Sequence, residues 1–265
     1  MPLSLGAVGF IDALGFKGIW RANDPEAVAN TLQDGRRTAE VMTGNVLDPE
    51  AVELFHSAGS FPDISAVAFS DTFLFAAVVP HAKDRERTLA AAAGLVACGL
   101  SSIIRTTALG PVPLTFRGVI ATGECIVDPQ NRVFIGPAVD EAADLMDLAN
   151  GAFTWLAPSA MRLDYSGWRS GSWGDLLVDY RVPLKDGRSI LTKVVNPFAL
   201  TSHGAGDFKQ IRENYSKAMK ADSVDVEVKR QNTEALFDHF ERLSRKHMEN
   251  MKRDHELRMS HLRET

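Results

Sequence analysis

Residues 7–13 form a short apolar run with one carboxylate, Asp12, near its end. A run of this length and composition predicts a buried β-strand, which places Asp12 at the edge of a site. Gly15 follows three residues later, and a glycine there lets the backbone turn tightly or lie close to a ligand. The sequence therefore predicts a strand and a tight turn with a carboxylate between them.

A second apolar segment, residues 64–79, is interrupted by Ser70, Asp71 and Thr72. Polar residues between two apolar runs predict a β-hairpin with Asp71 at its tip. Two carboxylates on neighbouring strand ends can hold a divalent cation such as Mg²⁺ or Mn²⁺ through their oxygen atoms. Asp12 and Asp71 are therefore candidate metal ligands. The alternative, which these two stretches leave open, is that both are ordinary aspartates at strand ends.

Length and composition are those of a soluble globular protein: 265 residues, 45% hydrophobic and 24% charged. The net charge of −5 and the pI of about 5.8 do not favour a nucleic-acid or membrane partner. Cys98 and Cys125 lack metal-ligand spacing, so we expect a reducing, cytoplasmic compartment. The N-terminus lacks the basic region of a signal peptide, and we expect no apolar run long enough to span a bilayer.

The chain up to about residue 200 alternates predicted helices with predicted strands. Helices are expected at 25–42, 48–55 and 83–109 and after Gly136; strands are expected at 114–123, 125–127, 133–135, 153–156, 176–183 and 189–196, with a loop at 166–174. Several of these strands are joined as hairpins. That order favours an α+β fold with a mainly antiparallel sheet.

The composition changes near residue 201, so we predict a domain over 1–200 and a helical C-terminal extension over 201–265. Residues 224–262 contain no Gly or Pro and carry apolar residues at three- and four-residue steps. This pattern predicts a long amphipathic helix, which must bury its apolar stripe against its own domain, itself or another chain.

Four of these stretches, in order, resemble the motifs of class III nucleotidyl cyclases. Residues 10–16 match the first metal-binding strand of that family, and residues 69–71 match its second metal-binding turn. Residues 117–124 look like its strand with an arginine and two glycines, and residues 135–143 look like its catalytic helix. The resemblance implies a ferredoxin-like catalytic domain over about residues 7–200.

The chain departs from purine cyclases at the positions that read the base and assist catalysis. Val67 and Val133 align with polar base-reading residues, and a valine side chain can neither donate nor accept a hydrogen bond. Asp140 and Asp144 align with a catalytic Asn and a transition-state Arg. These changes, with both metal aspartates kept, make the chain resemble the Pycsar-type pyrimidine cyclases, antiphage enzymes of bacteria that cyclise UTP or CTP. Residues 136–139, 182–187 and 194–197 add to this likeness.

The resemblance implies a site with two divalent ions, Mn²⁺ or Mg²⁺, held by Asp12, Asp71 and the backbone of Ile11. Cations for the triphosphate are expected in the order Arg117, Lys185, Arg188, although Arg117 is equally suited to a structural ion pair. The amides of Ile11 and of the turn Leu14, Gly15 and Phe16 are expected to cradle the β- and γ-phosphates. In this family each site lies between two catalytic domains, so the resemblance also implies a homodimer.

Three functions remain open on the sequence alone. The favoured one is a pyrimidine cyclase, with UTP weakly preferred to CTP. The second is a purine cyclase with an unusual base pocket. The third is a catalytically inactive, nucleotide-binding regulatory module, which Asp140 and Asp144 suggest and the two metal aspartates oppose.

Overall fold

The computed structural model describes residues 3–44, 62–80, 84–165, 175–199, 204–220 and 223–264. The predicted helix at 48–55 and the predicted loop at 166–174 lie outside these residues.

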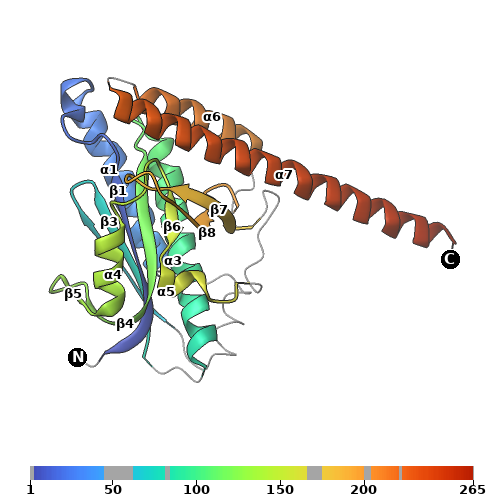
Figure 1. Cartoon of the computed structure of the whole chain (residues 1–265), viewed down its shortest axis with the longest axis horizontal. Helices are drawn as coiled ribbons and strands as arrows, with labels where there is room; N and C mark the ends of the chain where they lie inside the picture. Colours follow the sequence, from blue (N-terminus) through green and yellow to red (C-terminus); the bar gives the residue numbers. More distant parts are fainter. Residues whose placement is uncertain are drawn as a thin grey trace.

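An eight-stranded sheet forms the centre of the protein, with strand order β2-β3-β1-β4-β6-β8-β7 and β5 paired to β4 (Figure 1). The strands are β1 (Ser4–Ala13), β2 (Asp63–Phe69), β3 (Thr72–Val79), β4 (Phe116–Asp128), β5 (Val133–Ile135), β6 (Thr154–Leu156), β7 (Leu177–Pro183) and β8 (Ser189–Val195). Strands β4 and β6 are parallel, and the other paired strands are antiparallel. The predicted α+β fold with a mainly antiparallel sheet is confirmed.

Strand β1 lies between β3 and β4 and is buried over most of its length. Ala7, Val8 and Ile11 are fully buried, which fits the apolar run of the sequence. The neighbouring strand approaches closely at Gly118, where an added Cβ would collide with the carbonyl oxygen of Phe10. This glycine therefore allows β4 to bring its first residues beside the end of β1.

Two long helices, α1 (Pro25–Gly44) and α3 (Arg85–Ala108), cover one face of the sheet, and α4 (Pro137–Leu145) covers the other. The helix starts follow the sequence signals. The Asp24 carboxylate accepts the N–H groups of Glu26 and Ala27, both at 3.3 Å, and Asp84 accepts the N–H of Arg87 at 3.1 Å.

Helix α3 corrects one expectation, because it is long and apolar enough to cross a membrane. Most of its apolar window is buried inside the fold, where Leu100 and Ile103 are fully covered. An apolar surface on all sides is what a helix needs when it packs between a sheet and further helices. The hydropathy of α3 is therefore explained by its place in the core.

The remaining short elements are a 3₁₀ turn (Ile19–Arg21) and α5 (Pro158–Met161), and the C-terminal helices are α6 (Gly204–Ala218) and α7 (Val224–Glu264). The first half of α7 packs on its own domain, since Leu236, Phe237 and Phe240 are buried. The second half extends away from the rest of the molecule (Figure 1). One of the alternatives left open by the amphipathic stripe is thus realised for the first half of the helix.

Candidate active site

Asp12 lies at the end of β1, between residues of both neighbouring strands. It is paired in register with Thr72 of β3 and with Arg117 of β4. The hydroxyl of Thr72 donates a hydrogen bond of 2.8 Å to Oδ1 of Asp12. The Asp12 side chain is only 25% exposed. The neighbouring strands therefore fix its position, and part of the carboxylate remains accessible to a ligand.

Asp71 occupies the tight turn between β2 and β3. Ser70, the residue before it, has a left-handed backbone with φ of 56°, which is uncommon for a residue other than glycine. The N–H of Ala13 donates to the carbonyl of Asp71 at 3.2 Å, which holds the turn against the end of β1. The structure therefore brings the two predicted metal aspartates together.

The charge of Asp12 is disfavoured where it lies. Burial raises the pKa of its carboxyl group, and the negative charge of Asp71 raises it further. The hydrogen bond from Thr72 and the charge of Arg117 act in the opposite direction. A cation between the two carboxylates would offset both of the unfavourable effects.

Arg117 lies beside Asp12 and is 13% exposed. Its Nη2 is 3.8 Å from Oδ2 of Asp12 and forms an ion pair with Asp147. Its Nε is buried, with no hydrogen-bond partner in the described part of the chain. The guanidinium is thus held at the site by charge while some of its hydrogen-bonding capacity is unused.

Lys185 belongs to the same cluster, from the turn between β7 and β8. Its Nζ is 3.8 Å from Oδ1 of Asp147. Partial burial, followed by the positive charge of Arg117, lowers the pKa of this amine. Two cations therefore share the one carboxylate of Asp147, which is 60% exposed on the turn after α4.

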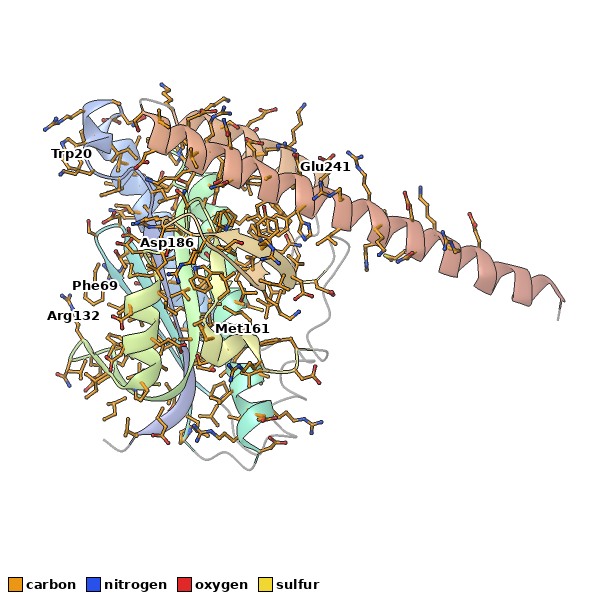
Figure 2. All side chains as sticks on the ribbon, viewed as in Figure 1. Trp20, Phe69, Arg132, Met161, Asp186 and Glu241 are labelled. Carbon is orange, nitrogen blue, oxygen red and sulfur yellow. The ribbon has the colours of Figure 1, made fainter. Side chains whose placement is uncertain are left out.

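Arg188 does not join this cluster. It is 79% exposed and pairs with Asp186 at 2.6 Å, on the turn labelled in Figure 2. The predicted phosphate cradle included the backbone N–H of Leu14. This N–H already donates to the carbonyl of Thr115 at 2.7 Å, so it is not free for a phosphate. Gly15 adopts φ of 71° with open space where a side chain would begin, and Phe16 follows it.

A metal ion would find few protein ligands here. The described residues contain no group of three or more His, Cys, Asp and Glu side chains that could hold one. Asp12 and Asp71 offer two carboxylates, and the backbone of Ile11 lies inside the sheet one residue before Asp12. Mg²⁺ is often bound by one or two carboxylates together with the phosphates of a substrate. The residues therefore fit a divalent ion that binds with a phosphate-bearing substrate.

Sequence reasoning missed Asp147. It follows α4 as one of several acids on a polar stretch, and nothing in its spacing distinguishes it from Asp140 and Asp144, which are exposed on α4 itself. Only the fold brings Asp147 to Arg117.

Val67 is half-buried on β2 and Val133 is exposed at the start of β5.

No family model matches the chain, and no curated protein matches it. Solved structures are similar to it at low identity. A rhodopsin-guanylyl cyclase catalytic core with converted specificity, in complex with ATPalphaS, is 12% identical with a TM-score of 0.46 over 73% of this chain and 96% of that one. The adenylyl cyclase CyaB from P. aeruginosa is 15% identical with a TM-score of 0.43 over 74% and 95% of the two chains. A bacterial light-regulated adenylyl cyclase is 14% identical with a TM-score of 0.40 over 80% of this chain and 57% of that one.

Proposed function

We propose that this protein is a nucleotidyl cyclase that converts a pyrimidine nucleoside triphosphate, UTP in preference to CTP, to its 3′,5′-cyclic monophosphate and pyrophosphate. The observation that carries the proposal is the meeting of Asp12 and Asp71 at the end of β1, beside Arg117. Carboxylates next to a guanidinium suit a substrate that brings both metal ions and phosphates.

The reaction is an in-line attack of the ribose 3′-oxygen on the α-phosphorus, with pyrophosphate as the leaving group. Asp12 and Asp71 would hold the divalent ions, Mn²⁺ or Mg²⁺, which lower the pKa of the 3′-hydroxyl and neutralise phosphate charge when bound. Arg117 and Lys185 would bind the β- and γ-phosphates, and the turn at Gly15 would let the chain approach them.

The choice of a pyrimidine rests on Val67 and Val133, which lack the hydrogen-bonding groups that the resemblance assigns to a purine reader. We also propose that the protein is a homodimer with shared sites, that it is cytoplasmic, and that its product is a messenger in antiphage defence. These parts of the proposal rest on the sequence resemblance.

The first experiment is product analysis. The purified protein is incubated with Mn²⁺ and each of the four ribonucleoside triphosphates, and pyrophosphate and cyclic product are measured. We expect cyclic product from UTP or CTP at a rate at least ~100-fold above that from ATP or GTP, the scale expected when hydrogen-bonding groups are matched or left unpaired. Comparable turnover of a purine would support a purine cyclase, and nucleotide binding without any product would support an inactive module.

Asp12→Asn and Asp71→Asn test the metal assignment. Each should abolish cyclisation, because one metal-binding carboxylate is lost. The melting temperature should change little, since the charge of Asp12 is disfavoured in the folded protein and Asp71 lies in a partly exposed turn, where a charge contributes little to folding. Asp63→Asn, at the exposed far end of β2, is the matched control and should keep full activity. If either site variant retained more than a few per cent of activity, the assignment would be wrong.

A further inference from the structure

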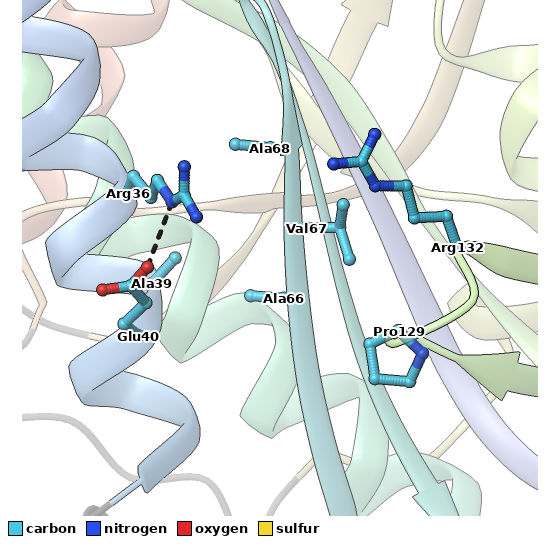
Figure 3. Close-up of a pocket in the computed structure, with 8 residues that line it drawn as sticks. All are labelled: Arg36, Ala39, Glu40, Ala66, Val67, Ala68, Pro129 and Arg132. Carbon is cyan, nitrogen blue, oxygen red and sulfur yellow. Dashed lines mark hydrogen bonds and ion pairs between the residues drawn. The ribbon is translucent and has the colours of Figure 1, made fainter.

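A hollow of about 210 Å³ surrounds the edge of the sheet at β2. Its lining comes from α1, from β2 and from the turn between β4 and β5; the residues are Arg36, Ala39, Glu40, Ala66, Val67, Ala68, Pro129 and Arg132. Figure 3 shows that Arg132 and Pro129 lie on the same side of β2 as Val67, while Arg36 and Glu40 lie on the opposite side. Each side of the strand therefore has one arginine.

The two arginines differ in what they bind. Nε of Arg36 is 3.0 Å from Oε1 of Glu40, so its charge is already paired. Arg132 has no carboxylate within ion-pair distance among the residues that the structure describes. Its guanidinium instead lies over the ring of Phe69, 5.9 Å from the ring centre. Arg132 is the cation of the hollow that is available to a ligand.

The fold holds Arg132 at this place. Asp128 accepts hydrogen bonds from the backbone N–H and the side-chain amide of Asn131, at 3.1 and 2.7 Å, which fixes the turn before Arg132. Arg132 itself has φ of 56°, a conformation uncommon for residues other than glycine. Phe69 is 40% exposed, and Figure 2 shows it next to Arg132 at the margin of the molecule.

The surroundings suit a flat ligand with hydrogen-bond acceptors. A guanidinium is planar and carries only donors, and the cation–π contact with Phe69 favours its position over the ring. Val67 and Pro129 supply apolar surface beside it. Phe69 precedes Asp71 by two residues, so this surface belongs to the same hairpin that carries a candidate metal ligand.

We propose that Arg132 reads the base of the nucleotide and favours uracil over cytosine. This inference rests on the proposed function and names the base-reading residue that the sequence did not provide. At its 4-position uracil presents a carbonyl acceptor, whereas cytosine presents an amino donor. A group with donors alone can satisfy the carbonyl and leaves the amino group unpaired. Phe69 acts as a positioning residue for the guanidinium.

The test uses the full chain with three ligands: UTP, CTP and ribose 5-triphosphate, which has no base. Binding constants are measured for wild type, Arg132→Gln, Arg132→Lys, Phe69→Leu and Arg36→Gln, and cyclisation of UTP and CTP is measured in parallel. Glutamine both donates and accepts, so Arg132→Gln should lower the UTP-to-CTP preference by roughly tenfold to a hundredfold. Arg132→Lys keeps a donor-only group and should retain part of the preference.

Two controls separate base reading from other effects. Arg132→Gln should leave the affinity for ribose 5-triphosphate unchanged, because a base reader does not contact phosphate. Arg36→Gln removes a charge from the other side of β2 and should change none of the three affinities. Phe69→Leu should lower the UTP preference in the same direction as Arg132→Gln, with no effect on ribose 5-triphosphate.

The possible failures are distinguishable. Equal loss of affinity for all three ligands in Arg132→Gln would make Arg132 a phosphate contact and would overturn the inference. An unchanged UTP-to-CTP ratio with intact cyclisation would overturn the inference and leave the proposed function standing. The predicted change of ratio in binding, without any cyclic product from wild type, would support the inference and overturn the cyclase. A wild-type protein that bound none of the ligands would overturn both.

Discussion

Arg117 lies between two carboxylates of different character. Asp12 belongs to the sheet and is largely buried, whereas Asp147 is 60% exposed on the turn after α4. The pair has one largely buried and one exposed partner, and a ligand with several negative charges can replace the Asp147 carboxylate as the partner of Arg117. We propose that Asp147 pairs with Arg117 and Lys185 where the triphosphate would bind, and that the nucleotide replaces it.

Asp147→Asn tests this role. Without the carboxylate, Arg117 and Lys185 keep their charges but lose the anion they share. We expect inorganic tripolyphosphate to bind roughly two- to fivefold more tightly, the equivalent of the exposed pair of Lys185 with Asp147. The measurement is isothermal titration calorimetry without metal. Asp34→Asn, which removes an exposed ion pair with Arg37 on α1, is the control and should change nothing. Weaker binding by Asp147→Asn would instead show that Asp147 orients Arg117 for the anion.

At the scale of single residues, the sequence could predict only features that depend on the residues next to them in the chain. The strand end at Asp12 and the hairpin tip at Asp71 follow from local pattern, whereas their shared metal site was implied by the family resemblance; the structure brings the two residues to the same end of β1. Asp147 and Arg132 were not predicted, because their roles depend on which distant strand the fold brings beside them. Arg188 was predicted as a phosphate ligand, and the structure pairs it with Asp186 away from the cluster.

At the element scale, the starts of helices and the tips of hairpins were the most predictable features. They depend on neighbouring residues alone, such as Asp84 before α3 or the turn at Ser70 and Asp71. The role of α7 was less predictable. A stripe that contains Leu236 and Phe240 looks the same in sequence whether its own domain or a second chain covers it.

The structure shows that α7 has two parts with different environments. In the first part, Asn232 donates to the carbonyl of Asn150 at 2.7 Å, and Thr233 accepts the N–H of Ala152 at 2.9 Å. Phe237 and Phe240 pack against Phe198 in the same region. Beyond Ser244, by contrast, Met248 and Met251 are exposed on the projecting helix.

Two truncations separate these parts. A chain ending at Ala221 loses buried side chains that are each worth roughly 1.5–3 kcal/mol and leaves the N–H of Ala152 without its partner. We expect it to be unfolded or insoluble. A chain ending at Arg245 keeps these contacts and should melt within a few degrees of the full chain, as measured by circular dichroism. A stable, fully active chain ending at Ala221 would show that α7 does not support the core.

At the scale of the whole molecule, one question is whether a single chain can complete its own site. Asp12 lies at the end of β1 and Asp71 lies in the β2–β3 turn, so both are at the same end of the central strands. Helix α4 packs over one face of the sheet, with Ala138 and Val139 buried against it and Asp140 exposed. The proposed shared site joins the metal aspartates of one chain to α4 of a second chain.

Complementation between two inactive chains tests the shared site. Asp71→Asn removes a metal ligand, and Asp140→Lys places a positive charge on the helix that would face the partner. Each variant alone should be inactive. When the two variants are combined in equal amounts and exchange chains, half of the dimers contain one chain of each variant. Each of these mixed dimers has one site with neither substitution. Activity should therefore return to about a quarter of the wild-type value, measured as cyclic product per chain.

Three controls complete this test. Each variant mixed with itself should stay inactive, and the wild-type protein should lose specific activity on dilution below its dimer dissociation constant, followed by light scattering. The chain ending at Arg245 should behave as the full chain does if the catalytic domains make the dimer. Loss of the dimer in that chain alone would assign association to the exposed end of α7. A monomer with undiminished activity, or a mixture that stayed inactive although mixed dimers formed, would remove the shared site.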